Sequence, residues 1–319
     1  MVAAAMNTFL GSLLLVAPLA HAFAGIPSFT KRISTMVTFG DSYSVQNVAG
    51  GRVQWPDWVA GYANITLYDY ARSGATCSNA LTPRIYGGVT EDELPLYFQQ
   101  ASNGSIHINT DKTVYTIWIG TNDVGAGCLL TGDQAPGVSI VDTTACVMNW
   151  VKTLYQRGAK NFIIQNMVPL HRIPMYQANA YPTKYWTLAK NATEWNAAMQ
   201  QLVKGGNALS KLMLADLAPT LPKARIALFD SFGLFNDMLD HPDRYLNGTA
   251  PYNTTGSANP CVYEPGASSA SYCTLVNETE VDSYVWYNEL HATNQANRVV
   301  AKEITELVRG RSSKWATWF

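Results

Sequence analysis

Residues 37–44 of the 319-residue chain read Val-Thr-Phe-Gly-Asp-Ser-Tyr-Ser. A run of β-branched and aromatic residues ends there abruptly in Gly-Asp-Ser. This pattern is expected where a buried strand ends with a small nucleophile at the open edge of a sheet. The hydroxyl group of Ser42 is therefore the first candidate catalytic group.

The segments that follow alternate between strand-like and helix-like patterns. Strands are predicted over residues 36–40, 65–70, 113–119, 161–167 and 225–230. Helices are predicted from residue 55 and over 92–101, 140–155, 185–217, 232–239 and 294–308. This alternation is typical of a parallel sheet with helices on both faces. We predict one α/β domain over residues 25–319, a three-layer α/β/α sandwich around a parallel sheet of about five strands.

The first 24 residues contain no Asp, Glu, Lys or Arg and carry a short apolar core over 9–20. Small residues two positions apart, at 20–22 and 22–24, are typical of signal-peptidase sites. A membrane anchor is the alternative, but the apolar run is short and Pro18 interrupts it. We predict a cleaved signal peptide over 1–24 and no membrane span elsewhere.

Composition narrows the range of partners. Hydrophobic residues make up 47% of the chain, charged residues only 14%, and the formal net charge is −1. A packed core is expected, and the lack of a basic block argues against nucleic acid as a partner. Six N-x-[ST] triplets predict a secreted, extracellular glycoprotein. Their asparagines are Asn64, Asn103, Asn191, Asn247, Asn253 and Asn277. We expect a monomer.

The five cysteines fit an oxidising compartment. Cys261 and Cys273 bracket a loop rich in Pro, Gly and Ser, and we predict that they pair. Cys128 and Cys146 bracket a second loop and are predicted to pair as well, which leaves Cys77 as a buried thiol. The chain has no C-x-x-C or H-E-x-x-H spacing, so we propose no metal and no cofactor.

Three further residues lie where the predicted topology would bring them to Ser42. Gly74 follows the second predicted strand, Asn122 ends the third, and His291 precedes the last helix. A serine hydroxyl needs an adjacent base, for which His291 is the candidate. The backbone N–H groups of Ser42 and Gly74 and the side-chain amide of Asn122 could form an oxyanion hole. Asp41 and Asp123 are predicted to support the neighbouring turns.

These blocks, taken in order, resemble the SGNH or GDSL hydrolase superfamily. The matching residues are Gly40-Asp41-Ser42-Tyr43, Gly74, Gly120-Thr121-Asn122-Asp123 and His291. With residues 40–44, 73–79 and 118–123, the chain more closely resembles the fungal secreted GDSL esterases of carbohydrate esterase family 16. We therefore expect a small-molecule or oligosaccharide ester as its substrate. That resemblance implies a flavodoxin-like three-layer fold, the Ser, Gly, Asn and His roles given above, and removal of acetyl groups from carbohydrates, including xylo-oligosaccharides. A GDSL lipase or phospholipase is the alternative within the class, and a catalytically silent carbohydrate-binding protein is the alternative outside it.

The last block departs from the superfamily pattern. An Asp usually stands three residues before the catalytic His, whereas this chain has Asn288. The Asp of a catalytic triad orients the imidazole and stabilises the imidazolium. Glu289 or Asp282 could supply the missing carboxylate, or the chain could have lost its activity. We predict that Asn288 orients His291 through its side-chain oxygen.

Overall fold

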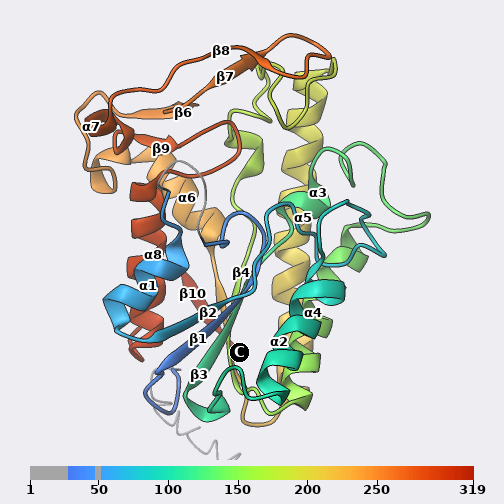
Figure 1. Cartoon of the computed structure of the whole chain (residues 1–319), viewed down its shortest axis with the longest axis vertical. Helices are drawn as coiled ribbons and strands as arrows, with labels where there is room; N and C mark the ends of the chain where they lie inside the picture. Colours follow the sequence, from blue (N-terminus) through green and yellow to red (C-terminus); the bar gives the residue numbers. More distant parts are fainter. Residues whose placement is uncertain (1–27, 47–51) are drawn as a thin grey trace, which may run out of the picture.

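The computed structural model of the chain describes residues 28–46 and 52–319, so the predicted signal peptide lies outside the described residues. In this part of the chain, six strands form the central sheet in the order β10-β5-β4-β3-β1-β2 (Figure 1). The five parallel strands are β1 (Thr35–Gly40), β2 (Thr66–Asp69), β3 (Thr113–Trp118), β4 (Asn161–Gln165) and β5 (Arg225–Phe229). They confirm the five predicted strands. The sixth, β10 (Ala316–Trp318), pairs antiparallel with β5 and was not predicted.

Helices cover both faces of the sheet, which confirms the three-layer α/β/α architecture. Figure 1 shows α1 (Trp55–Ala63), α6 (Ser231–Asp240) and α8 (Asn294–Val308) on one side of the sheet. The other side carries α2 (Leu94–Ser102), α4 (Ile140–Gln156) and α5 (Ala192–Leu217). Neighbouring residues of β1 point to opposite faces, because Met36 joins one apolar core and Val37 the other.

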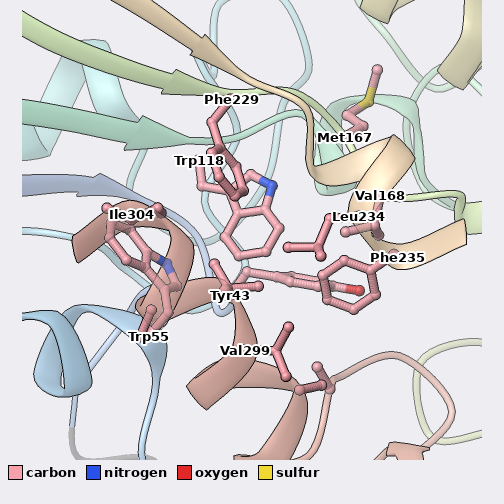
Figure 2. Packing of buried hydrophobic residues seen from close by; sticks show 14 of the residues in the cluster. Tyr43, Trp55, Trp118, Met167, Val168, Phe229, Leu234, Phe235, Val299 and Ile304 are labelled. Atoms are coloured by element: carbon pink, nitrogen blue, oxygen red, sulfur yellow. The ribbon is translucent and has the colours of Figure 1, made fainter. Parts of the chain in front are cut away.

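The core under α1, α6 and α8 also fixes the residue next to Ser42. The Tyr43 ring packs among Trp118, Phe235 and Val299 (Figure 2), with its centroid 5.2 Å from that of Trp118. The Tyr43 hydroxyl donates a hydrogen bond of 2.6 Å to the carbonyl oxygen of Leu290. The turn after β1 is therefore tied to the segment that carries His291.

The polar region between α6 and α8 contains small sheets above the carboxyl edge of the main sheet (Figure 1). Strand β6 (Asn253–Ser257) pairs with β9 (Tyr284–Trp286), and β7 (Cys261–Tyr263) pairs with β8 (Ala270–Cys273). Two short helices of a single turn are also present, α3 (Thr121–Val124) after β3 and α7 (Glu278–Val281) before β9. A π-helical turn at Val89–Glu93 precedes α2. None of the helices in the described ranges is both long and apolar enough to cross a bilayer.

The long helix predicted from residue 185 begins only at Ala192. The side chain of Asn191 caps it by accepting a hydrogen bond from the backbone N–H of Glu194. Thr183 and Trp186 form an isolated antiparallel bridge instead of a helical turn. The segment before Asn191 is therefore a loop, and its Lys184 and Tyr185 line the catalytic cavity described below.

One predicted disulfide is confirmed and the other is wrong. Cys261 and Cys273 are bonded and close the β7–β8 hairpin. Cys146 pairs with Cys77 rather than with Cys128. Cys128 is buried, and its sulfur lies 3.4 Å from Nε of Arg84. The prediction relied on two cysteines flanking one loop, but a parallel sheet brings together loops from distant parts of the sequence, here after β2 and along α4.

The six predicted glycosylation asparagines differ in exposure. Five of them are exposed, namely Asn64, Asn103, Asn191, Asn247 and Asn277. Asn253 is partly buried, and its Oδ1 accepts the backbone N–H groups of Thr255 and Gly256.

Candidate active site

Ser42 lies in the turn directly after β1 and faces His291. Its Oγ is 2.8 Å from Nε2 of His291. The turn depends on Gly40, which has φ +139°, and a Cβ there would come within 2.2 Å of the carbonyl oxygen of Trp118. Gly40 therefore lets β1 run close against β3 while it delivers Ser42 to the edge of the sheet.

His291 lies in a tight loop between β9 and α8. The backbone N–H of Tyr287 donates to the carbonyl oxygen of His291 at 2.7 Å and closes the loop. The Thr293 hydroxyl then caps α8 by accepting the N–H of Ala296. The loop-closing hydrogen bond and the helix cap together fix the backbone on either side of His291, just before α8 begins.

The other ring nitrogen of His291 has two oxygen neighbours. Nδ1 is 3.0 Å from Oδ1 of Asn288 and 3.1 Å from the hydroxyl oxygen of Tyr185. A neutral imidazole that accepts the Ser42 proton at Nε2 must carry its own proton on Nδ1. Both oxygens are placed to accept that Nδ1 proton.

The loop also decides which end of the Asn288 amide faces the imidazole. Oδ1 of Asn288 accepts the backbone N–H groups of Leu290 at 3.0 Å and of His291 at 2.8 Å. A rotated amide would place its NH2 group against both donors and leave them unpaired. The amide therefore presents an acceptor to Nδ1, as a carboxylate would, but without its charge.

The two alternative partners of His291 are engaged elsewhere. Oε1 of Glu289 accepts the backbone N–H of Cys261 at 2.7 Å and the hydroxyl of Tyr181 at 2.9 Å. Asp282 forms an ion pair with Arg298. Of the three candidates, the structure brings Asn288 to His291, while Glu289 anchors the β7–β8 hairpin.

The predicted oxyanion donors line the same cavity as Ser42 and His291. This cavity has a volume of about 360 Å³ and includes Gly74 and Asn122 in its wall. Gly74 has φ +81°, and a Cβ there would lie 2.4 Å from the ring of Tyr86. Nδ2 of Asn122 donates one hydrogen bond to the carbonyl oxygen of Ala75 at 2.8 Å. That bond orients the amide and leaves its second N–H available.

Asp41 and Asp123 are buried below the cavity and bind backbone groups. Oδ1 of Asp41 accepts the N–H of Tyr43 at 2.9 Å. Asp123 accepts the N–H of Cys77 and, at 3.0 Å, the hydroxyl of Thr82. Burial raises the pKa of Asp41 to about 7 and that of Asp123 to about 6. These contacts are those of residues that hold the turns around Ser42.

Four residues around the site were not predicted from the sequence: one buried carboxyl below the cavity and three residues of the cavity wall. Glu93 is fully buried and accepts the N–H of Gly40 at 2.9 Å through Oε2, and burial raises the pKa of its carboxyl well above the ordinary value. It lies in a segment that looks like a plain amphipathic helix, so no sequence signal pointed to it. Arg52, Lys184 and Tyr185 belong to the cavity wall. The only available signal was the aromatic-rich stretch around Tyr185.

The charge around His291 is positive on the cavity side. Arg52, Arg84 and Lys184 line the cavity, and none of its lining residues, all within the described ranges, is acidic. Burial lowers the pKa of His291 well below its usual range, and the charges of Arg52 and Lys184 lower it further. The imidazole is therefore neutral at neutral pH and able to accept a proton. In the described part of the chain, no cluster of His, Cys, Asp and Glu side chains is arranged to hold a metal.

Comparison with known proteins agrees with this geometry. Residues 36–304 match the model of the GDSL-like Lipase/Acylhydrolase family. The chain belongs to this family. It is therefore a carboxylic ester hydrolase, and the matched residues include Ser42, Gly74, Asn122 and His291.

Two curated relatives of this GDSL hydrolase align over most of their length. An acetylesterase of Hypocrea jecorina is 26% identical over an alignment of 347 positions, gaps included, which covers 93% of this chain and 95% of the relative. An acetylesterase of Thermothelomyces thermophilus is 21% identical over 310 residues, covering 86% and 88% respectively.

Proposed function

We propose that this GDSL hydrolase is a secreted serine acetylesterase that removes O-acetyl groups from plant cell-wall oligosaccharides. The observation that carries the proposal is the 2.8 Å contact between Oγ of Ser42 and Nε2 of His291 in a cavity that also contains Gly74 and Asn122. A nucleophile, its base and oxyanion donors then share one site, which is the minimum that acyl transfer requires.

In the first half-reaction, Oγ of Ser42 attacks the acetyl carbonyl carbon while Nε2 of His291 takes the hydroxyl proton. The negative charge on the carbonyl oxygen is held by the N–H groups of Ser42 and Gly74 and by the amide of Asn122. The C–O bond to the sugar breaks, and the sugar oxygen receives the proton from Nε2. In the second half-reaction, Nε2 of His291 takes a proton from a water that attacks the acetyl carbon. The bond from that carbon to Oγ of Ser42 breaks, Oγ receives the proton from Nε2, and acetate leaves.

Asn288 sets the strength of this base. Its Oδ1 keeps the Nδ1 proton in place, so Nε2 remains the acceptor. It adds no negative charge to stabilise the imidazolium that forms in each transition state. An ester is less demanding than an amide in this respect, because its alkoxide leaving group departs with less help. We therefore expect esterase rather than amidase activity.

The size of the cavity and the relatives support the acetyl group as the acyl part. A volume of about 360 Å³ lies at the lower end of the range for ligand pockets and favours a short acyl chain over a lipid tail. Both aligned relatives are acetylesterases. Two disulfides, the leader-like first 24 residues and the six glycosylation triplets support secretion.

A series of p-nitrophenyl esters of increasing acyl length tests the proposal on wild type, Ser42→Ala and the remote control Ser102→Ala. We expect kcat/KM to fall with acyl length, to collapse in Ser42→Ala and to be unchanged in Ser102→Ala. Activity that rises with acyl length would favour a lipase or phospholipase. Absence of activity in wild type and Ser42→Ala alike would favour a silent carbohydrate-binding protein. Release of acetate from acetylated xylo-oligosaccharides then tests the carbohydrate part.

A further inference from the structure

The cavity above Ser42 contains cations without matching anions. Arg52, Arg84 and Lys184 line it. All 23 acidic residues of the chain fall within the described ranges, and none forms an ion pair with these three cations. Partly buried charges are normally paired, because taking an isolated charge out of water is costly. Arg52 and Arg84 are partly buried whereas Lys184 is exposed, so the missing partner of the buried cations is expected to come from a ligand.

Arg84 already donates hydrogen bonds to backbone carbonyl groups of the protein. Its Nη2 donates to the carbonyl oxygens of Ala126 at 2.7 Å and Asn122 at 3.2 Å. These bonds hold the loop that carries the Asn122 amide. Arg84 thus has a structural role that explains its position, and the ligand argument rests on the two other cations.

Arg52 and Lys184 make no comparable polar contacts. Nε and Nη1 of Arg52 are buried without a hydrogen-bond partner in the described part of the chain. The guanidinium stacks over the Tyr287 ring, 5.1 Å from its centroid, and the Lys184 ammonium lies 5.0 Å from the ring centroid of Tyr185. The aromatic rings position both cations while leaving their N–H donors free. Arg52 lies in the cavity wall with no acidic partner, and its planar guanidinium is suited to pairing with a carboxylate.

Building on the proposed function, we propose that Arg52 and Lys184 form an anion subsite, and that the preferred substrate is an acetylated oligosaccharide whose sugar carries a carboxylate, that is, a uronic acid. The carboxylate would bind the two cations while the acetyl ester reaches Ser42. This subsite would select among acetylated sugars, which the Ser42–His291 pair by itself cannot do.

The subsite also has a consequence for catalysis. In the free enzyme, Arg52 and Lys184 oppose a positive charge on His291, and Asn288 offers no negative charge to compensate. A bound carboxylate offsets one of these two positive charges, so the imidazolium forms at lower cost. The substrate would then supply part of the charge that an Asp supplies in other members of the family. Its effect should therefore appear in kcat as well as in KM.

The test compares acetylated methyl glucuronide with acetylated methyl glucoside, which differ in the carboxylate, by measuring acetate release. Wild type should prefer the uronate by ~10-fold or more in kcat/KM, as expected for charge-assisted hydrogen bonds. In Arg52→Gln and in Lys184→Gln the preference should shrink, and in the double variant it should disappear. For the neutral glucoside, kcat should rise slightly, because the cations no longer oppose the imidazolium. Lys302→Gln, an exposed position on α8, is the matched control.

The outcomes separate the subsite from the proposed function. Equal rates on both sugars in wild type, or equal losses on both sugars in the variants, would overturn the subsite. Hydrolysis of p-nitrophenyl acetate that depends on Ser42 would still support the esterase. If wild type does not hydrolyse p-nitrophenyl acetate at all, both the subsite and the proposed esterase function are overturned. Arg52→Lys covers the case that Arg52→Gln does not fold, since it keeps the charge and should retain part of the preference. Added salt should lower the uronate preference of wild type and leave the glucoside rate nearly constant.

Discussion

Charged side chains lie on two sides of Ser42, and they differ in sign, burial and partners. Below the serine are the carboxyl groups of Asp41, Glu93 and Asp123, each no more than 1% exposed. All three accept backbone N–H groups, and burial raises the pKa of each. Above the serine, the cavity wall carries cations and no carboxylate among its described lining residues.

This difference shows that proximity to the nucleophile in the sequence is a poor guide to chemical role. Asp41 is next to Ser42 and Asp123 is next to Asn122, yet both point into the protein and hold turns. Arg52 and Lys184 belong to loops that no motif marks, yet they face the substrate side. The buried carboxyls provide hydrogen-bond geometry, whereas the cations provide the electrostatic field at the reaction centre.

The largest effect is expected at His291. In His291→Gln, kcat/KM for p-nitrophenyl acetate should fall by at least ~10⁴, because Ser42 loses its proton acceptor. His241→Gln, an exposed histidine after α6, should keep wild-type activity. If a buried carboxyl were the base instead, His291→Gln would stay active and Asp41→Asn would not.

The next effect is expected at the oxyanion hole. Asn122→Ala removes one donor, so kcat should fall by ~10²–10³ with little change in KM. The change also removes the hydrogen bond to the carbonyl oxygen of Ala75, so thermal unfolding should be measured in parallel. A higher KM with an unchanged kcat would instead mean that Asn122 contributes to substrate binding and not to transition-state stabilisation.

A smaller effect is expected from the amide that replaces the usual carboxylate. In Asn288→Ala, kcat should fall by ~10–100-fold, because Nδ1 loses an acceptor and the loop loses the hydrogen bonds to two N–H groups. Glu289→Gln keeps the acceptor for Cys261 and should have nearly wild-type kcat. An inactive Glu289→Gln together with an active Asn288→Ala would mean that Glu289, not Asn288, orients His291.

The pH profile sharpens the same point. His291 must be neutral to act as a base, and burial together with Arg52 and Lys184 lowers its pKa well below 6.5. The acid limb of kcat/KM should therefore lie well below pH 6.5. In Asn288→Asp a carboxylate favours the imidazolium, so the limb should move to higher pH. An acid limb at an ordinary histidine pKa in wild type would contradict the positive environment described here.

The smallest effect is expected from the buried carboxyls, and it concerns stability. Burial raises the pKa of Asp41 from 3.8 to about 7 in the folded state. Its contribution to stability is complete below its unfolded pKa and is lost as the pH rises toward 7. In urea unfolding, Asp41 should make wild type lose about 3 kcal/mol of stability between pH 4 and 7, and Asp41→Asn should not show this loss. An unchanged pH slope would show that Asp41 is not held in its neutral form.

The fold and the core of the site could be predicted because they depend on local patterns. Strands β1, β3, β4 and β5 are rich in β-branched, aromatic and other apolar residues, as strands buried on both faces require. Ser42, Gly74 and Asn122 follow β1, β2 and β3 respectively, and parallel strands bring their carboxyl ends to one edge. The short strand β10 was missed because three residues at a sheet edge carry no recognisable period.

The remaining features depend on contacts between distant segments. Cys77 and Cys146 are 69 residues apart and meet only because the loop after β2 packs near α4. Glu93 contacts Gly40 from a π-helical turn, which no pattern in the sequence predicts. Tyr185 seemed to open a helix because aromatic and apolar residues continue into α5 without a break in period. Only the cap at Asn191 ends that pattern, and a single Asn is a weak signal.

The most direct test of the account is to trap the acyl-enzyme. The protein is mixed with excess p-nitrophenyl acetate, quenched in acid within the first turnovers, digested and mapped by mass spectrometry. The account predicts one added acetyl group on the peptide that contains Ser42, in wild type and not in Ser42→Ala or His291→Gln. An acetyl group on a different residue in a protein that still turns over the ester, or turnover without any acetylated Ser42 in the pre-steady state, would contradict it.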